Sequence, residues 1–157
     1  MSKSYLETYL NDHLAGASAA VEMLGLLRQI DPGNDWTGIE AEIVQDRLEL
    51  QQLMKRANIG ESRTRQAVAW LSEKLTELKS RLDDESGGPL RRLELVELLG
   101  LGIDGKRALW AALQTAADVT PALRDADYDR LIRRAEQQRA TVETRRLAIG
   151  AVALAGA

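Results

Sequence analysis

The sequence predicts an all-α protein, an antiparallel up-and-down bundle of four to five helices within a single domain, residues 1–157. Apolar residues recur at steps of three and four over most of the chain, which is the spacing of one helix face. Capping residues and helix breakers interrupt this pattern at several places. Aromatic residues make up only 4% of the chain and phenylalanine is absent. The core must therefore come from aliphatic side chains and alanine, which favour helices over sheets.

The first predicted helix runs from Ser4 to about Ile30. Its apolar or small positions fall on one face: Leu6, Leu10, Ala17, Ala20, Leu24 and Leu27. His13 falls in the same row. The segment 31–35, Asp-Pro-Gly-Asn-Asp, must end this helix, because proline restricts the residue before it and glycine tolerates a positive φ.

The second helix is predicted to be capped by Thr37, with Glu40 three residues later completing a capping box. Its apolar row, which Asp46 interrupts, is Ile39, Ile43, Leu50 and Leu53. The segment 58–60, Asn-Ile-Gly, indicates a left-handed carboxyl-terminal cap. A third helix capped by Ser62 is expected to follow, with an apolar row of Val68, Leu71, Leu75, Leu78 and Leu82.

A polar, glycine-rich link at residues 83–89 precedes a fourth helical segment. Its apolar positions are Leu93, Val96, Leu99, Ile103, Leu109, Trp110 and Leu113. Thr120 and Pro121 are typical of a cap followed by proline at the first helical position, so we expect a fifth helix to open there. Its apolar row is Leu131, Ala135, Val142 and Ile149. Because the links are short, sequential helices are expected to pack antiparallel.

The composition narrows the possible functions. The chain has no cysteine, which excludes disulfides, thiolate nucleophiles and cysteine-based metal sites. No secretion signal is visible at the start, and the apolar tail 147–157 is about half of the roughly 20 residues that a membrane-spanning helix needs. We therefore expect a cytoplasmic protein without a membrane segment, whose tail docks on the bundle or on a second subunit if it is ordered. The net charge of −3 argues against broad attraction to nucleic acid.

Residues 100–105, Gly-Leu-Gly-Ile-Asp-Gly, match the G-x-G-x-x-G string of dinucleotide-binding proteins. That chemistry needs a strand before the first glycine and a helix start after the last one. Residues 93–99 already have the pattern of a helix, so the match is interpreted as accidental and no cofactor is expected. The glycines are instead expected to bend the helix or to let it approach a neighbour closely.

His13 is the only histidine, and histidine is the usual proton shuttle near neutral pH and a common metal ligand. It lies one turn after Tyr9 and one turn before Gly16 and Ala17, so a cavity could form beside it. The alternative is a core histidine held by one hydrogen bond.

Asp46 is a second polar residue in an apolar row, and a buried carboxylate must find a partner or take up a proton. Folding the first two helices about their turn separates Asp46 from His13 by roughly 9 Å along the axis, too far for a direct dyad. The same register places Lys74 near Asp46, and an ion pair between them is the default expectation. A binding site here would use Tyr9, His13, Asp46 and Glu49.

The fifth predicted helix is rich in arginine: Arg130, Arg133, Arg134, Arg139, Arg145 and Arg146. A row of guanidinium groups could bind phosphates. Glu136 and Glu143 lie among these arginines, however, and reduce the positive charge of the helix. The second helix is acidic, with Glu40, Glu42, Asp46 and Glu49. We therefore expect the two helices to pair within the bundle or between subunits, and we do not expect nucleic-acid binding.

The order of long helices, with a break before the last, resembles the ferritin-like superfamily, and residues 5–14 are similar to the first helix of uncharacterised bacterial members. In metal-binding members, two helices each supply a Glu and two others each supply a Glu-x-x-His pair. The nearest strings here are EIVQ at 42–45, ELQQ at 49–52, EQQR at 136–139 and ETRR at 143–146. Arginine would place a fixed positive charge where the ions must sit. The resemblance therefore implies the fold without its metal centre, and no metal is expected.

No complete catalytic constellation is visible, so we do not expect an enzyme. The sequence instead predicts a non-catalytic helical bundle that acts through self-association, with a dimer as the default, or through a protein partner of unknown identity. The alternative is a ferritin-like protein that binds a small molecule or a single metal ion near His13.

Overall fold

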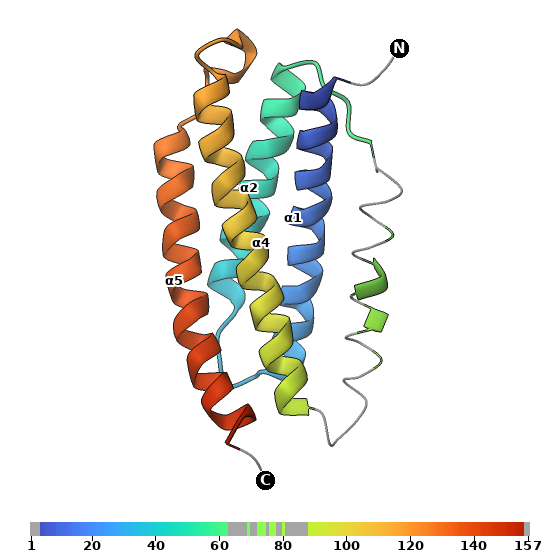
Figure 1. Cartoon of the computed structure of the whole chain (residues 1–157), viewed down its shortest axis with the longest axis vertical. Helices are drawn as coiled ribbons and strands as arrows, with labels where there is room; N and C mark the ends of the chain where they lie inside the picture. Colours follow the sequence, from blue (N-terminus) through green and yellow to red (C-terminus); the bar gives the residue numbers. More distant parts are fainter. Residues whose placement is uncertain are drawn as a thin grey trace.

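The computed structural model describes residues 4–62, 69, 72–74, 76–77, 80 and 88–155. Four long helices lie side by side in it (Figure 1): α1 (Tyr5–Ile30), α2 (Thr37–Arg56), α4 (Gly88–Ala116) and α5 (Tyr128–Ala153). None of the described residues belongs to a strand, so the prediction of an all-α protein is confirmed for this part of the chain. No helix within it is both long and apolar enough to cross a membrane.

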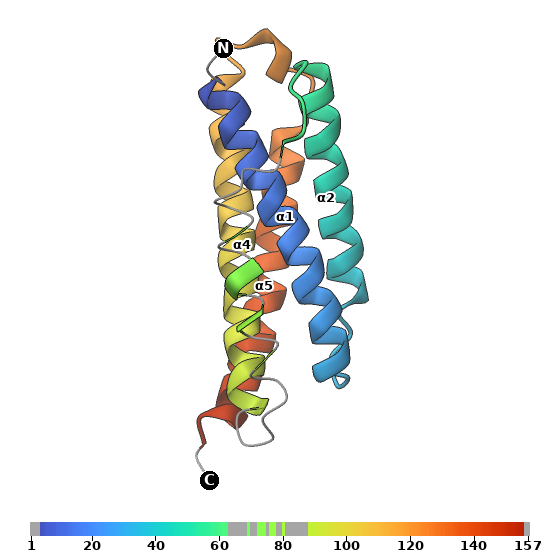
Figure 2. The same cartoon turned by 90° about the vertical axis from the view of Figure 1, so that its right-hand side faces the viewer.

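The four helices occupy the corners of an elongated block. In Figure 1, α1 and α5 run downward while α2 and α4 run upward. Turning the molecule by 90° places α4 and α2 on opposite sides, with α1 in front of α5 (Figure 2). Helices α1 and α5 therefore lie on one diagonal and α2 and α4 on the other, and each helix has neighbours of opposite direction.

The turn between α1 and α2 is held by a buried carboxylate. Asp31 accepts hydrogen bonds from the indole Nε1 of Trp36 and from Nδ2 of Asn34, each at 2.9 Å. Trp36 is completely buried by this arrangement. The helix breakers of this segment were predicted from the sequence, and the structure confirms that α1 ends at Ile30.

The two ends of α2 were predicted with unequal success. The capping box of Thr37 and Glu40 is not formed, because Thr37 is already helical and its backbone N–H donates to Oδ1 of Asp35 at 3.0 Å. At the other end, Asn58 has a φ of 56°, so the predicted left-handed cap is confirmed. The predicted third helix, with its row from Val68 to Leu82, lies mainly outside the described residues; the few described positions between 69 and 80 are helical.

Helix α4 is continuous from Gly88 to Ala116, so its glycines do not break it. The expected close approach is found at Gly100. A Cβ atom added there would lie 3.3 Å from Cζ of Arg139, which means that the guanidinium of α5 lies directly against the backbone of α4.

The fifth helix begins later than predicted. Thr120 and Pro121 open the one-turn 3-10 helix η1 (Pro121–Leu123), and α5 starts only at Tyr128. The side chain of Asp127 caps it by accepting from the backbone N–H of Arg130 at 3.0 Å. The hydroxyl of Tyr128 donates to the carbonyl of Leu123 at 2.6 Å, which ties the short helix to the long one.

The apolar core forms two clusters along the long axis, one around Trp36 and one around Trp110. On α2, Asp46 lies between Ile43 of the first cluster and Leu50 of the second. On α4, Lys106 lies in the same way between Ile103 and Leu109. A polar layer therefore separates the two halves of the core.

Candidate functional site

The polar layer is centred on Asp46, which is only 2% exposed. Lys106 on α4 approaches it with Nζ 2.5 Å from Oδ2. Arg134 on α5 donates to Oδ1 from Nε at 2.8 Å and also from a terminal nitrogen. Nε2 of Gln138 lies 3.2 Å from Oδ2. Both carboxylate oxygens of Asp46 are thus occupied by donors of the same chain, and the pairing with Lys74 predicted from the sequence was wrong.

The layer continues along the facing surfaces of α2 and α5. Arg134 also binds Oε1 of Glu49 at 3.0 Å, and Arg130 binds Oε2 of the same side chain at 2.7 Å. Gln138 donates to Glu42 at 3.0 Å and accepts from Lys106. The predicted pairing of the acidic second helix with the arginine-rich fifth helix is therefore confirmed within the chain.

Burial changes the proton affinity of Lys106. Removal of the ammonium group from water lowers the pKa of Lys106, while the charge of Asp46 beside it raises that pKa and offsets part of the effect. The charge of Lys106 therefore depends on the partner that this carboxylate provides.

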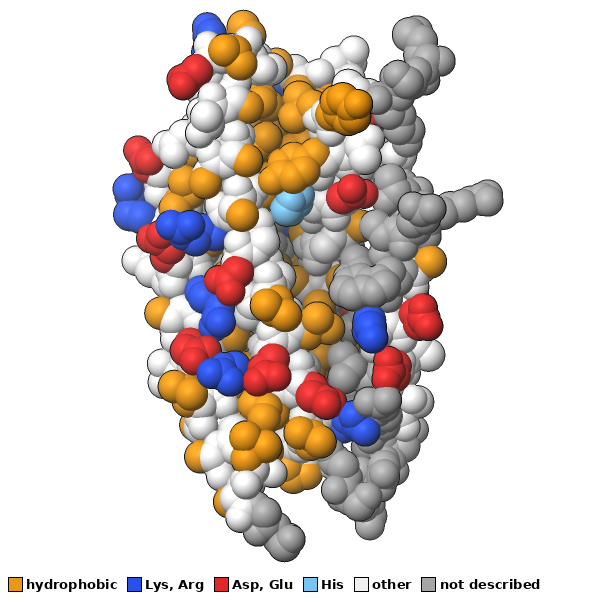
Figure 3. Space-filling model, in the orientation of Figure 1, with side chains coloured by type: hydrophobic (Ala, Val, Ile, Leu, Met, Phe, Trp, Pro, Cys, Tyr) orange, Lys and Arg blue, Asp and Glu red, His pale blue; other side chains and the backbone are white. Residues whose placement is uncertain are grey.

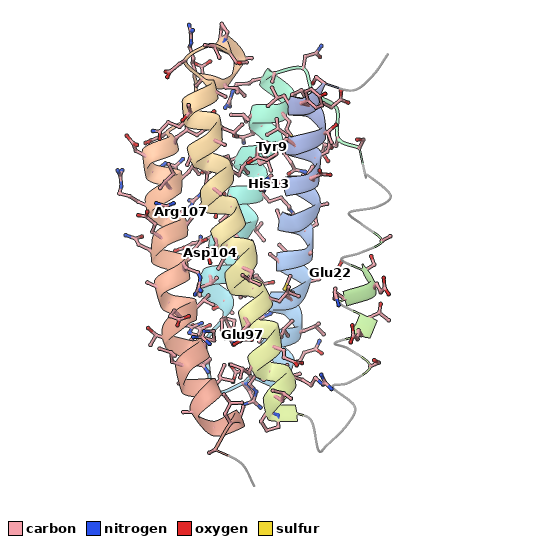
Figure 4. All side chains as sticks on the ribbon, viewed as in Figure 1. Tyr9, His13, Glu22, Glu97, Asp104 and Arg107 are labelled. Atoms are coloured by element: carbon pink, nitrogen blue, oxygen red, sulfur yellow. The ribbon has the colours of Figure 1, made fainter. Side chains whose placement is uncertain are left out.

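Two further arginines of α5, Arg139 and Arg146, form ion pairs on the outer face of the molecule. Arg139 lies 2.9 Å from Asp104 and 3.1 Å from Glu143. Arg146 lies 3.1 Å from Glu97 and 2.7 Å from Glu143. Figure 4 labels Glu97, Asp104 and Arg107 along the side of α4 next to α5. These guanidinium groups are neutralised by carboxylates of the same chain, an arrangement that does not favour phosphate binding.

A cavity of about 70 Å³ lies beside the polar layer, between α1, α2 and α4. Small residues make room for it, namely Gly16, Ala17 and Ala20 on α1 and Gly102 on α4. Its polar lining consists of His13, Asp46, Arg47, Lys106 and Trp110, and aliphatic side chains complete the wall. The volume is roughly twice the 30 Å³ that one water molecule occupies in the liquid, so only a small molecule would fit.

His13 lines this cavity from α1 and is partly exposed, so it lies between the cavity and solvent. Its ring meets the ring of Tyr9 edge to face, with centroids 4.6 Å apart (Figure 4). Figure 3 shows the histidine at the surface among apolar side chains. Burial lowers the pKa of His13, and Asp12 raises it by a smaller amount. The imidazole is therefore neutral at pH 7.

The four residues predicted to form a site are only partly brought together. His13 and Asp46 line the same cavity, and Tyr9 contacts His13. Glu49 does not line the cavity, because its carboxylate turns toward α5 to pair with Arg130 and Arg134.

Sequence reasoning missed Arg47, Lys106 and Trp110 as site residues. Lys106 could have been found from the sequence, because it interrupts the apolar row of α4 between Ile103 and Trp110. Asp46 interrupts the apolar row of α2 in the same way. Arg47 gives no such signal, since an arginine on a charged helix is expected at the surface. Trp110 was assigned only to the core.

Metal-ligand chemistry does not fit this arrangement. Among the residues that the structure describes, no three His, Asp or Glu side chains gather as a metal site. Asp46 is the carboxylate that lines the cavity, and Lys106 and Arg134 already place two positive charges on it. A divalent cation would be repelled there.

The fold and the site together define an all-α protein with a buried polar layer and a small cavity beside it. No protein-family model, curated protein or solved structure matches the chain.

Proposed function

We propose that the chain is a non-catalytic binding protein that holds a small molecule in the cavity beside His13. One observation carries the proposal. Trp110 lines the cavity and is 1% exposed, yet its indole N–H has no hydrogen-bond acceptor among the described residues. Native proteins leave few buried donors unpaired. A molecule with an acceptor atom, held in the cavity, would satisfy this one.

The polar side chains at the cavity support binding better than catalysis. Asp46 and Lys106 are bound to each other and to α5, so neither is free to exchange protons with a substrate. Neutral His13 could accept a proton, but none of the described residues that line the cavity with it is a serine or threonine that would act as a nucleophile.

Heteronuclear NMR of the indole N–H groups tests this function. The chain has three tryptophans, and Trp110→Phe identifies the Trp110 signal. We expect at least one of three small probes, acetate, acetamide and ethanol, to shift that signal saturably. Ala17→Leu should abolish the shift by filling the cavity, whereas Ala108→Leu on the exposed side of α4 should not. If no probe shifts the signal, or if the shift survives Ala17→Leu, the proposal is wrong.

Self-association into a dimer is a second candidate role, favoured by the end of α5. Leu147, Val152 and Leu154 are all more than half exposed, and exposed apolar groups that gather in one place often mark an interface. Within the described part of the tail, the expected docking on the bundle is found for the buried Ile149 and for the partly buried Ala153, which packs against the same core cluster. A second copy of the chain would cover the exposed side chains. Sedimentation of the chain and of its Leu147→Glu, Leu154→Glu variant should give a dimer and a monomer, respectively. A monomer in both samples would remove this role.

A ferritin-like architecture without a metal centre remains part of the proposal, as does a cytoplasmic location. The alternating direction of four long neighbouring helices supports the architecture (Figure 1). Arg139 and Arg146 end the two Glu-x-x-Arg strings that come nearest to the superfamily's Glu-x-x-His pattern, and both form ion pairs with carboxylates. The absence of cysteine from the whole chain fits a reducing compartment.

A further inference from the structure

Two side chains at the cavity carry donors without acceptors. One is the indole N–H of Trp110, and the other is the Nε–H of Arg47 on α2. Both atoms are buried, both residues line the cavity, and neither bonds to another described residue. Tryptophan and arginine have no acceptor atom in their side chains. A molecule held in the cavity would have to supply the acceptors if these two donors are to be paired.

The charges around the cavity are not balanced. In the polar layer, the three cations Lys106, Arg130 and Arg134 face the three carboxylates of Glu42, Asp46 and Glu49. Arg47 stands outside this group, and no carboxylate of the described residues pairs with it. The charged residues of the cavity lining, Asp46, Arg47 and Lys106, therefore carry one positive charge in excess.

The size and the walls of the cavity limit the ligand further. A volume of about 70 Å³ is too small to enclose a nucleotide or a sugar. Aliphatic side chains form much of the wall, with Ile43, Leu50, Ile103 and Leu109 among them. A ligand with a charged end and a short apolar end would match both parts of the lining, whereas a phosphate or sulfate ion would leave the apolar part without a partner.

From these observations we infer that the ligand is a small monocarboxylate, whose carboxylate oxygens accept hydrogen bonds from Arg47 and Trp110 and whose short hydrocarbon end contacts the aliphatic wall. This inference rests on the proposed binding function and names its ligand class. Hydrogen bonds in which one partner is charged are worth more than neutral ones. Arg47 should therefore supply most of the preference for an anion, and Trp110 should orient it.

The test compares acetate with acetamide, which has almost the same shape but no charge. Both are titrated at constant ionic strength while the indole signal of Trp110 is recorded. We expect acetate to bind at least about tenfold more tightly than acetamide, as a charged hydrogen bond predicts. Arg47→Gln should remove that preference. Arg133→Gln, an exposed arginine of α5 that does not line the cavity, should preserve it.

The outcomes separate the inference from the proposed function. If acetamide binds as tightly as acetate, the carboxylate inference is wrong and the binding function stands. If the preference for acetate persists in Arg47→Gln, Arg47 is not the group that recognises the ligand, and the inference is again wrong. If neither probe, nor ethanol, shifts the Trp110 signal saturably, the binding function itself is wrong.

Discussion

Lys106 on α4 and Asp46 on α2 meet in the interior with Nζ 2.5 Å from Oδ2, and their side chains are only 13% and 2% exposed. Taking two such charges out of water costs several kcal/mol for each ion, which only a close and well-bonded partner offsets. Each residue interrupts an apolar row of its own helix. The pair therefore links two helices at a place where either residue alone would be destabilising.

Asp46→Asn tests this dependence. The variant leaves Lys106 near the core without its carboxylate and leaves Arg134 with Glu49 alone, so we expect the free energy of unfolding to fall by about 3 kcal/mol. Urea unfolding followed by circular dichroism measures the loss. Asp104→Asn is the matched control, because it removes an exposed ion pair with Arg139 and should cost less than about 1 kcal/mol. Equal losses in the two variants would contradict a special role for Asp46.

The sequence could predict features that depend on neighbouring residues, but not contacts between individual residues that lie far apart in the chain. The first helix and its turn were predicted well, because Ser4 and Pro32 act on their immediate neighbours. Asp46 was recognised as a buried polar residue from its place in one apolar row. Its partner Lys106 was not recognised, because Lys106 lies 60 residues further along the chain. Choosing between Lys74 and Lys106 requires knowing which helix packs against α2.

The candidate site shows the same limit. The small residues of α1 left room for either close helix packing or a cavity beside His13, and the structure has a cavity there. The other walls come from α2 and α4, and their contribution depends on how these helices are rotated about their axes. A one-residue change in that rotation would move Arg47 or Trp110 away from the cavity, since successive side chains of a helix point about 100° apart.

A comparison of two glycines in α4 tests the close approach of Arg139. A Cβ atom at Gly105 would meet nothing within 4 Å, so Gly105→Ala should stabilise the protein by about 0.5 to 1 kcal/mol through helix propensity. At Gly100 the same atom would lie 3.3 Å from the guanidinium of Arg139, which would have to shift away from Asp104. We expect Gly100→Ala to change the unfolding free energy very little. Equal gains in the two variants would mean that Arg139 does not need the space.

The hydrogen bond between Asp31 and Trp36 is expected to hold the turn between α1 and α2. Asp31→Ala would leave the buried indole N–H of Trp36 without an acceptor, which should cost about 1 to 3 kcal/mol. Asp31→Asn keeps an acceptor oxygen and should cost less. Chemical unfolding of both variants measures the difference. If the asparagine and alanine variants lose the same stability, the hydrogen bond is not what holds the turn.

His13 should make the stability of the protein depend on pH below neutrality. Its pKa is lowered in the folded state by burial, whereas the unfolded chain has a pKa near the ordinary value of 6.5. As the pH falls below about 6.5, the unfolded state binds a proton before the folded state does, and the free energy of unfolding decreases. The decrease should level off once the pH is below the folded-state pKa.

The variant His13→Gln isolates this effect, because it keeps a polar side chain but removes the titration. Urea unfolding of both proteins between pH 8 and pH 5 gives two stability curves, and the carboxylates contribute almost equally to each. We expect the curves to run parallel above about pH 7 and to approach or cross below it, because only the histidine protein loses stability through this group. Curves that stay parallel over the whole range would show that His13 has the same proton affinity in both states, and hence that it is not desolvated by the cavity region.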